Sequence, residues 1–218
     1  MDSPQNQIVI VGVTGASGSL LAQAAVRMLN ADSRVARIHL VVTETGLRLL
    51  DHELHISAPL SELPVRLLGP SAKRSPKFEI HPNSDVGASI ASGSYPADNM
   101  CVIPCSMGAL SAIANGTSND LLSRAADVTL KEGRRLVLCI RDTPFSRIHL
   151  ENMLRAQQAG AVIMPAIPSY YHQPQTISDL VDQYVCRVLA QMGLPQQRQF
   201  EWKGQPSLKR PERKIFEV

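Results

Sequence analysis

The sequence predicts an α/β protein built on a doubly wound parallel sheet in a single three-layer domain. Largely apolar runs of strand length recur along the chain, at residues 8–13, 37–43, 99–104, 136–140 and 161–164. Such runs are typical of parallel strands that are buried on both faces. Segments with helical spacing follow most of them, and this alternation predicts helices on both sides of the sheet. The 218 residues suffice for one domain with a substantial core.

The composition argues against several classes of protein. The net charge of +3 is too small to indicate nucleic-acid binding, and an aromatic content of 4% argues against a stacking platform for single strands. No run approaches the ~18 apolar residues of a membrane span, and the N-terminus lacks the basic region and apolar core of a secretory signal. We therefore expect a cytoplasmic protein without nucleic-acid or membrane partners, which binds any anion locally.

Residues 8–20 predict a strand, a tight turn and the start of a helix. Small and hydroxyl-bearing residues fill this turn: Gly12, Thr14, Gly15, Ser17, Gly18 and Ser19. Glycines allow a ligand to approach the backbone closely, and a helix N-terminus adds free N–H groups, so the turn is a candidate phosphate site. The spacing matches neither the G-x-G-x-x-G dinucleotide fingerprint nor a triphosphate loop that ends in Gly-Lys-Ser/Thr. The alternative is a tight turn without a ligand.

A strand at 37–43 and a helix at 45–54 complete a β-α-β unit. A dinucleotide-binding domain usually places Asp or Glu at the end of this second strand to hold a ribose diol. Here Thr43 takes that place and Glu44 follows it, which favours a mononucleotide. His52 and His55 are expected at the surface.

The periodicity fails over residues 55–98, where six prolines are interspersed with basic and polar residues. We therefore expect an irregular excursion without a long helix. Such segments in compact domains are usually functional or lie at an interface, so we expect this one to close over a site or to pack on a neighbouring subunit. Residues 91–94, Ala-Ser-Gly-Ser, form a second hydroxyl-rich stretch within it.

The strand at 99–104 opens into another turn of small and hydroxyl-bearing residues at 105–110. Ligands of open parallel sheets bind at the carboxyl ends of the strands, beside helix N-termini. The next helix carries Arg124 and Lys131, which are seven residues apart and so lie nearly on one face. A solvated helix face is the alternative explanation for these two cations.

The strand at 136–140 is followed directly by Arg141 and Asp142, whose charges are expected to point into the crevice. The remaining predicted elements are a helix at 146–159, a strand at 161–164, a loop at 165–174 that carries Tyr170, Tyr171 and His172, and a helix at 177–192 that carries Arg187. Residues 1–194 then form the domain, and residues 195–218 form a tail that is either an arm or disordered.

The cysteine pattern indicates buried free thiols and no metal site. The four cysteines are scattered, and three of them lie within apolar segments. A zinc site needs about four ligands, and no His or Cys pair follows Cys101 and Cys105 at ligand spacing.

Taken together, these segments resemble the UbiX-type flavin prenyltransferases. The resemblance rests on eight segments in order: Gly12-Val-Thr-Gly-Ala-Ser-Gly18, Ala91-Ser-Gly-Ser94, Pro104-Cys-Ser-Met-Gly-Ala-Leu-Ser111, Arg124-Ala-Ala-Asp-Val-Thr-Leu-Lys-Glu132, Leu136-Val-Leu-Cys-Ile-Arg-Asp-Thr-Pro-Phe145, Ile148-His-Leu-Glu-Asn-Met153, Gly160-Ala-Val-Ile-Met-Pro165 and Tyr170-Tyr-His-Gln-Pro-Gln175. The resemblance implies a flavodoxin-like homo-oligomer, commonly a dodecamer. It would join reduced FMN to the dimethylallyl group of dimethylallyl phosphate without a metal. The product, prenylated FMN, would serve a UbiD-type decarboxylase.

The resemblance also implies roles for individual residues. Residues that match the family's FMN contacts are Gly15, Ala16, Ser17, Thr43, Ser106, Met107, Gly108, Ala109 and Arg124. Residues that match the dimethylallyl phosphate site are Lys131, Arg141, Tyr171 and Arg187. Glu53 and Asp142 match acidic positions, and Trp202 matches a C-terminal tryptophan. The cations would stabilise the leaving phosphate, while Ser17, Glu53 or Asp142 would manage the proton.

Two departures from the family pattern affect the expected function. The second FMN loop usually ends in Thr where this chain has Ala109, which should weaken FMN binding by about 1 kcal/mol. The acid after the arginine is usually Glu where this chain has Asp142, and a shift of about 1 Å in a catalytic group can cost about a hundredfold in rate.

Two further classes stay open as alternatives. A non-catalytic flavin carrier would explain the departures at Ala109 and Asp142. A flavin-dependent Cys decarboxylase shares the glycine loop, but the P-x-M-N-x-x-M-W motif of those enzymes is absent from this sequence.

Overall fold

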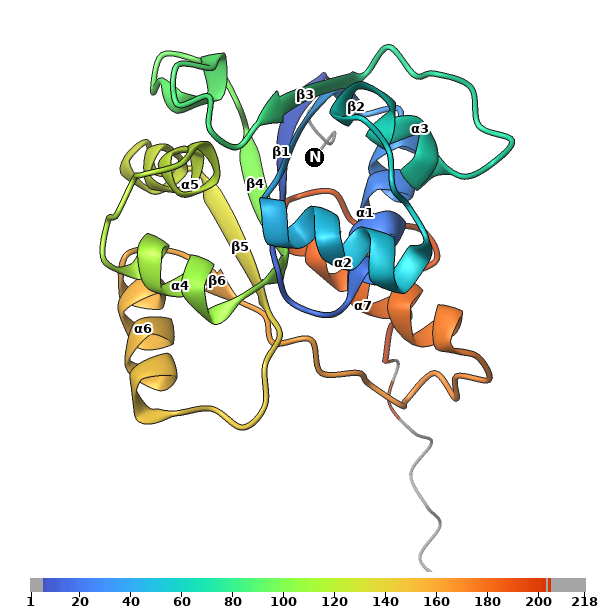
Figure 1. The fold of residues 1–218 in the computed structure, drawn as a ribbon. Coiled ribbons are helices and arrows are strands. Elements are labelled where there is room, and N and C mark those ends of the chain that lie inside the picture. The colour runs from blue at the N-terminus through green and yellow to red at the C-terminus, as the bar shows by residue number, and fades with distance from the viewer. Residues whose placement is uncertain (1–5, 203, 205–218) are drawn as a thin grey trace, which may run out of the picture.

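A computed structural model describes residues 6–202 and residue 204 of the chain (Figure 1). At its centre lies a six-stranded sheet with the order β3-β2-β1-β4-β5-β6, in which all neighbouring strands are parallel. The strands are β1 (Gln7–Val13), β2 (Val35–Val42), β3 (Phe78–Pro82), β4 (Asn99–Cys105), β5 (Arg135–Ile140) and β6 (Val162–Ile163). The predicted doubly wound parallel sheet is confirmed.

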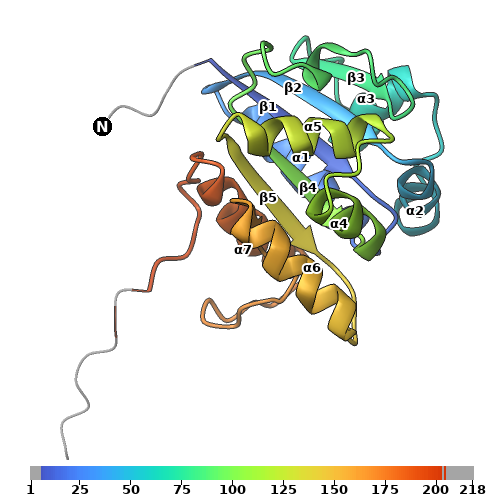
Figure 2. The same ribbon diagram turned by 90° about the vertical axis from the view of Figure 1, so that its left-hand side faces the viewer.

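Helices cover both faces of the sheet, so the domain has three layers. They are α1 (Ser19–Ala31), α2 (Glu44–Leu54), α3 (Leu63–Leu68), α4 (Met107–Ala114), α5 (Leu121–Lys131), α6 (Arg147–Gln158) and α7 (Ile177–Gln191). One buried cluster joins the sheet to α1, α3 and α7, and a second joins the opposite face to α4, α5 and α6. Figure 2 shows the second group of helices on the near side of the sheet.

Five of the strands, in the order β2-β1-β4-β5-β6, reproduce the flavodoxin arrangement, and β3 adds a sixth strand at the edge. This strand corrects the expectation that residues 55–98 are irregular throughout. The segment contains α3, β3 and two 3-10 turns, at Leu60–Glu62 and Ser89–Ala91. The strand escaped prediction because it is short, lies at an edge and alternates apolar residues with Glu79 and His81, so it lacks an apolar run.

The core is built as the apolar runs predicted. All seven residues of β4 are buried, and so are the last five residues of β5. All four cysteines are free and buried, as predicted, and burial raises the pKa of the Cys139 thiol to about 12. A thiol in such a position stays protonated and unreactive. Among the described residues, no helix combines the length and the apolar character needed to cross a membrane.

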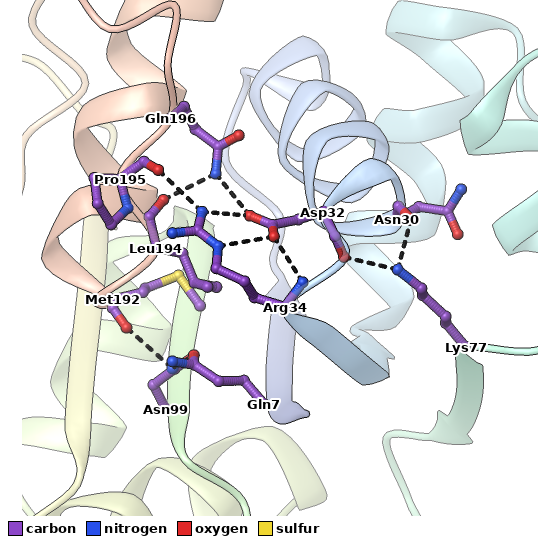
Figure 3. A network of polar contacts seen from close by, with 10 residues as sticks. All are labelled: Gln7, Asn30, Asp32, Arg34, Lys77, Asn99, Met192, Leu194, Pro195 and Gln196. Carbon is purple, nitrogen blue, oxygen red and sulfur yellow. Dashed lines mark hydrogen bonds and ion pairs between the residues drawn. The ribbon is translucent and has the colours of Figure 1, made fainter. Parts of the chain in front are cut away.

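Polar side chains close the amino edge of the sheet, where the strands begin (Figure 3). Arg34 forms an ion pair with Asp32 at 2.6 Å and donates to the Pro195 carbonyl oxygen at 2.9 Å. Gln196 Nε2 donates to the same carboxylate oxygen, Asp32 Oδ2, at 3.0 Å. The hydrogen bond from Arg34 lowers the pKa of Asp32 to about 2, although partial burial opposes the shift. We call these residues, together with Gln7, Lys77 and Asn99, the amino-edge network.

This network also fixes the start of the segment predicted to be a tail. Besides the contacts of Pro195 and Gln196, the Phe200 N–H donates to Gln183 Oε1 on α7 at 2.8 Å. Asn99 at the start of β4 donates to the Met192 carbonyl oxygen at 3.1 Å. The first residues after 194 are therefore hydrogen-bonded to the domain, and most of the predicted tail lies outside the described residues.

Candidate active site at the carboxyl edge of the sheet

The two predicted ligand loops lie side by side at the carboxyl edge of the sheet, where the strands end. They follow β1 and β4, which are neighbours because the strand order reverses between them. The Thr14 hydroxyl joins the loops, since it donates to the Pro104 carbonyl oxygen at 2.8 Å and accepts from the Ser106 N–H at 2.8 Å. Open parallel sheets bind their ligands in the crevice at such a reversal.

Close packing explains two glycines of the first loop. A β-carbon on Gly15 would overlap the Thr45 side chain at the start of α2. Gly18 has a φ of 123°, a conformation that residues with side chains rarely adopt. The backbone of this loop therefore lies against α2, with the Ser17 side chain exposed at its tip.

The N-terminus of α1 already has an anionic partner within the chain. Glu53, near the end of α2, accepts hydrogen bonds from the Gly18 N–H at 3.0 Å and from the Ser19 N–H at 2.7 Å. The N–H groups of Gly18 and Ser19 are therefore not free, contrary to what was expected of this helix start. A phosphate placed on them would meet the like charge of the carboxylate.

Glu53 also connects to Ser17, and Ser17 connects to Arg141. Burial raises the pKa of Glu53, but hydrogen bonds from the Ser19 N–H, the Ser17 hydroxyl and the Gly18 N–H together lower it below its usual value. Arg141 Nε, directly after β5, donates to the Ser17 carbonyl oxygen at 3.0 Å. We call Ser17, Glu53 and Arg141 the carboxyl-edge cluster. It brings an ionised acid, a hydroxyl and a guanidinium together from three separate segments.

Other predicted site residues surround this cluster in positions that their local structure explains. The Thr43 and Ser106 hydroxyls cap α2 and α4, since they accept from the Gly46 N–H at 3.0 Å and the Ala109 N–H at 3.3 Å. Gly108 is exposed, and within the described part of the chain no atom beyond its neighbours and its own helix backbone lies within 4 Å of the place of a β-carbon, so the start of α4 is open to a ligand.

Asp142 lies next to the cluster, directly after Arg141. One oxygen of its carboxylate accepts from the following Thr143 N–H at 2.8 Å. This local hydrogen bond holds the side chain at the start of the turn that leads to α6.

Arg124 and Lys131 lie on α5, beside the hydroxyl-rich stretch 91–94. Arg124 donates to the Ala91 carbonyl oxygen at 3.1 Å and forms an ion pair with Asp127 at 2.7 Å. Lys131 forms an ion pair with Glu132, and both side chains lie against Gly93. The two cations therefore line one polar surface, as their spacing predicted. α5 begins beside Asn83 at the carboxyl end of β3, so the Lys131 end of this surface lies away from the carboxyl-edge cluster.

Two of the four residues predicted to hold the substrate phosphate, Lys131 and Arg141, do not meet within one chain. Lys131 ends α5 just before β5 begins, whereas Arg141 follows the end of β5. The six residues of β5 span about 20 Å, so the two cations lie at opposite edges of the sheet. Arg187 lies on α7, which covers the opposite face from α5.

The fourth residue predicted for the phosphate site, Tyr171, lies in the loop between β6 and α7. Its side chain is 70% exposed, and its ring centroid lies 5.4 Å from that of Trp202. The tryptophan singled out in the sequence thus contacts a residue predicted for the phosphate site.

One cluster of chemically active residues was missed in the sequence. His39, Glu79 and His81 lie together between β2 and β3. The signal that could have found them is the i, i+2 spacing of Glu79 and His81, which places both on one face of a strand. It was missed because β3 itself was not predicted.

Comparison with known proteins agrees with this fold and crevice. A family model described as Flavoprotein matches residues 1–189. The flavin prenyltransferase UbiX of Halalkalibacterium halodurans is 42% identical over 89% of this chain and 93% of its own length. That of Pseudomonas aeruginosa is 39% identical over 94% of this chain and 97% of its own. The chain therefore belongs to the Flavoprotein family and, within it, to the UbiX flavin prenyltransferases.

Solved structures agree with this placement. AnUbiX (PadA1) in complex with FMN and dimethylallyl pyrophosphate is 39% identical, with a TM-score of 0.81 over 93% of this chain and 100% of that one. A dodecameric FMN-dependent UbiX-like decarboxylase from Escherichia coli O157:H7 is 40% identical, with a TM-score of 0.79 over 91% and 100% of the two chains. The FMN-dependent cysteine decarboxylase TvaF is 12% identical with a TM-score of 0.54, which shows a shared fold alone.

Proposed function

We propose that this chain transfers the dimethylallyl group of dimethylallyl phosphate or pyrophosphate to reduced FMN, giving prenylated FMN. The observation that carries the proposal is the carboxyl-edge cluster, in which Ser17, Glu53 and Arg141 meet beside the two loops expected to hold the flavin. A relative that is 39% identical binds both FMN and dimethylallyl pyrophosphate. The physical task of such a site is to hold two substrates, stabilise a leaving phosphate and move one proton.

The residues around the crevice suit a flavin mononucleotide. Gly15, Ala16 and Ser17 offer a compact loop, and the open start of α4 offers the first-turn N–H groups of Met107 and Gly108 beside it. We propose that these residues, with Thr43 and Arg124, contact FMN. Reduced FMN supplies the nucleophilic N5 atom and the neighbouring ring carbon that accept the prenyl group.

We propose that the leaving phosphate binds to Lys131, Arg141, Tyr171 and Arg187 from more than one copy of the chain. The Arg141 guanidinium has N–H donors left for a phosphate, because within the described residues only its Nε has a hydrogen-bond partner. Because Lys131 lies at the opposite edge of the sheet from Arg141, a neighbouring copy must supply it. Charge-assisted contacts of this kind stabilise an anionic leaving group without a metal.

The surface of α6 supports assembly into a homo-oligomer. Ile148, Leu150 and Leu154 are 67%, 54% and 56% exposed, which is unusual for large apolar side chains on one helix. A relative from Escherichia coli is dodecameric. We propose that copies of this chain pack through such surfaces and form a dodecamer.

We propose that Glu53 and Ser17 manage the proton, with Asp142 as a neighbouring acid. The lowered pKa of Glu53 keeps the carboxylate ionised at neutral pH, so it is ready to accept a proton through the Ser17 hydroxyl. The backbone hydrogen bonds from Gly18 and Ser19 fix the direction of the carboxylate and so pre-organise the relay.

In the direct test, the protein is incubated with reduced FMN and dimethylallyl phosphate in the absence of oxygen. The mass of the flavin is then measured. A prenyltransferase gives a flavin that is heavier by one prenyl unit. A carrier returns unchanged FMN although it binds the flavin, and this result would reject the proposal.

We further propose that the product passes to a UbiD-type decarboxylase in the cytoplasm. The resemblance to UbiX proteins motivates this partner, and the four free thiols suit a reducing compartment. Transfer of prenylated FMN from this protein to an apo-decarboxylase, measured as recovered decarboxylation, tests it. A decarboxylase that stays inactive in the presence of the prenylated product would contradict this partner.

A further inference from the structure

His39, Glu79 and His81 share one face of the sheet at its β3 edge. In the parallel register, His39 on β2 lies opposite Glu79 on β3, and Val41 lies opposite His81. Side chains two residues apart on a strand point to the same side, so all three groups converge. This is the face covered by the segment that carries Tyr95 and Ile90.

The ligand atoms of these three side chains are close enough to share one ion. His39 Nδ1 lies 2.8 Å from His81 Nε2, and the Glu79 carboxylate oxygens lie 3.9 Å from the first and 3.6 Å from the second. All three ligand atoms fall within 4.8 Å of one another. Ligands bound to one transition metal at about 2.0–2.2 Å lie at comparable distances from each other.

The surroundings match those of a metal ligand set. The His39 ring is fully buried, and its other nitrogen, Nε2, lies 2.7 Å from the Tyr95 hydroxyl. Histidine ligands almost always use their second nitrogen in such an outer hydrogen bond. His39 Nδ1 and His81 Nε2 share a hydrogen bond in this structure, so metal binding releases the shared proton and turns both nitrogens toward the ion. The Glu79 side chain is 38% exposed, so the group opens to solvent on one side.

We infer that His39 Nδ1, His81 Nε2 and the Glu79 carboxylate form a binding site for a divalent transition metal ion, with Zn²⁺ as the chemically favoured occupant. Two imidazoles and one carboxylate suit zinc, and water completes the coordination from the open side. Binding requires Glu79 to exchange its 2.8 Å ion pair with Arg37 for the metal. The metal would join the edge strand β3 to β2 and lies outside the carboxyl-edge cluster, so prenyl transfer does not depend on it.

The experiment titrates the full-length, metal-stripped protein with ZnCl₂ by calorimetry and with CoCl₂ by absorption. We expect one ion per chain and a cobalt spectrum without thiolate charge-transfer bands. Glu79→Gln and His81→Gln should each weaken binding at least tenfold, and Tyr95→Phe about 10–100-fold, as is usual for outer hydrogen bonds. His52→Gln and His55→Gln, at exposed histidines of the α2 region, are matched controls that should leave binding unchanged.

The partly exposed Glu79 allows a test that does not depend on a buried substitution. Its variant should keep the far-ultraviolet circular dichroism of the parent protein and lose the rise in melting temperature that zinc gives the parent. Zinc binding that is absent from the parent, or equal in the parent and in folded Glu79→Gln and His81→Gln, would overturn the assignment.

Discussion

The two edges of the sheet use similar polar groups in opposite ways. In the amino-edge network, Asp32, Arg34 and Gln196 satisfy one another and tie the segment after residue 194 to α1. In the carboxyl-edge cluster, Ser17, Glu53 and Arg141 are also joined, but Ser17 is exposed and the nearby start of α4 is open. The difference teaches that polar groups paired within the chain stabilise this fold, while groups left partly unpaired at the crevice are available for substrates.

The largest expected effect comes from removing the charge of Glu53. Glu53→Gln keeps an oxygen that can accept from Gly18 and Ser19, so the fold should persist. Loss of the general base should lower kcat for prenyl transfer about 10²–10⁴-fold. Steady-state formation of prenylated FMN measures this effect. Glu44→Gln, at an exposed position of the same helix, is the matched control. Equal rates for the two variants would show that Glu53 is not the general base.

Removal of single cations should come next in size. Lys131→Ala and Arg187→Ala should each lose about 1.5–3 kcal/mol of charge-assisted binding, which slows prenyl transfer about 10–150-fold while FMN affinity changes little. Arg48→Ala, an exposed cation on α2, should change the rate by no more than about 0.5 kcal/mol. Rates are measured with dimethylallyl phosphate below saturation. Parental rates in both site variants would show that Lys131 and Arg187 are ordinary solvated residues and do not bind the phosphate.

The amino-edge network should affect stability and leave catalysis unchanged. The folded pKa of Asp32 is about 2, against an ordinary value of 3.8. A depressed pKa stabilises the folded state above the ordinary value, and this contribution is lost as the pH falls from about 4 to 2. Asp32→Asn should therefore cost about 2 kcal/mol at neutral pH, and the difference should shrink across that window. Urea unfolding at several pH values checks this, and a pH-independent difference would contradict it.

The smallest expected effect concerns the family departure at Ala109. Ala109→Thr restores a hydroxyl at the start of α4 and should tighten FMN binding by about 1 kcal/mol, or about fivefold. Fluorescence titration of FMN measures the affinity. Ala112→Thr, further along α4, is a control, and an equal gain there would show that the hydroxyl acts without contacting the flavin.

The sequence predicted the buried parallel strands well because each is an apolar run that is typical of a strand buried on both faces. It also located the loops at Gly15 and Ser106, whose residue types suit a helix start at a strand end. It could not predict β3, since an edge strand with Glu79 and His81 lacks that pattern. The contact of Glu53 with the start of α1 was equally hidden, because it joins residues 34 and 35 positions apart. Local patterns predict elements, whereas side chains that meet across elements need the structure.

The proposed active site combines the carboxyl edge of one copy with Lys131 from another. Lys131→Ala and Arg141→Ala chains co-expressed with different tags and purified as mixed oligomers test it directly. If different copies supply these two residues, about a quarter of the sites in the mixture regain both, and prenyl transfer recovers to about that fraction of the parental rate. Ser17→Ala mixed with Arg141→Ala should not recover, because those residues contact each other within one chain. Mixed oligomers of Lys131→Ala and Arg141→Ala that stay as inactive as this control would contradict a shared site.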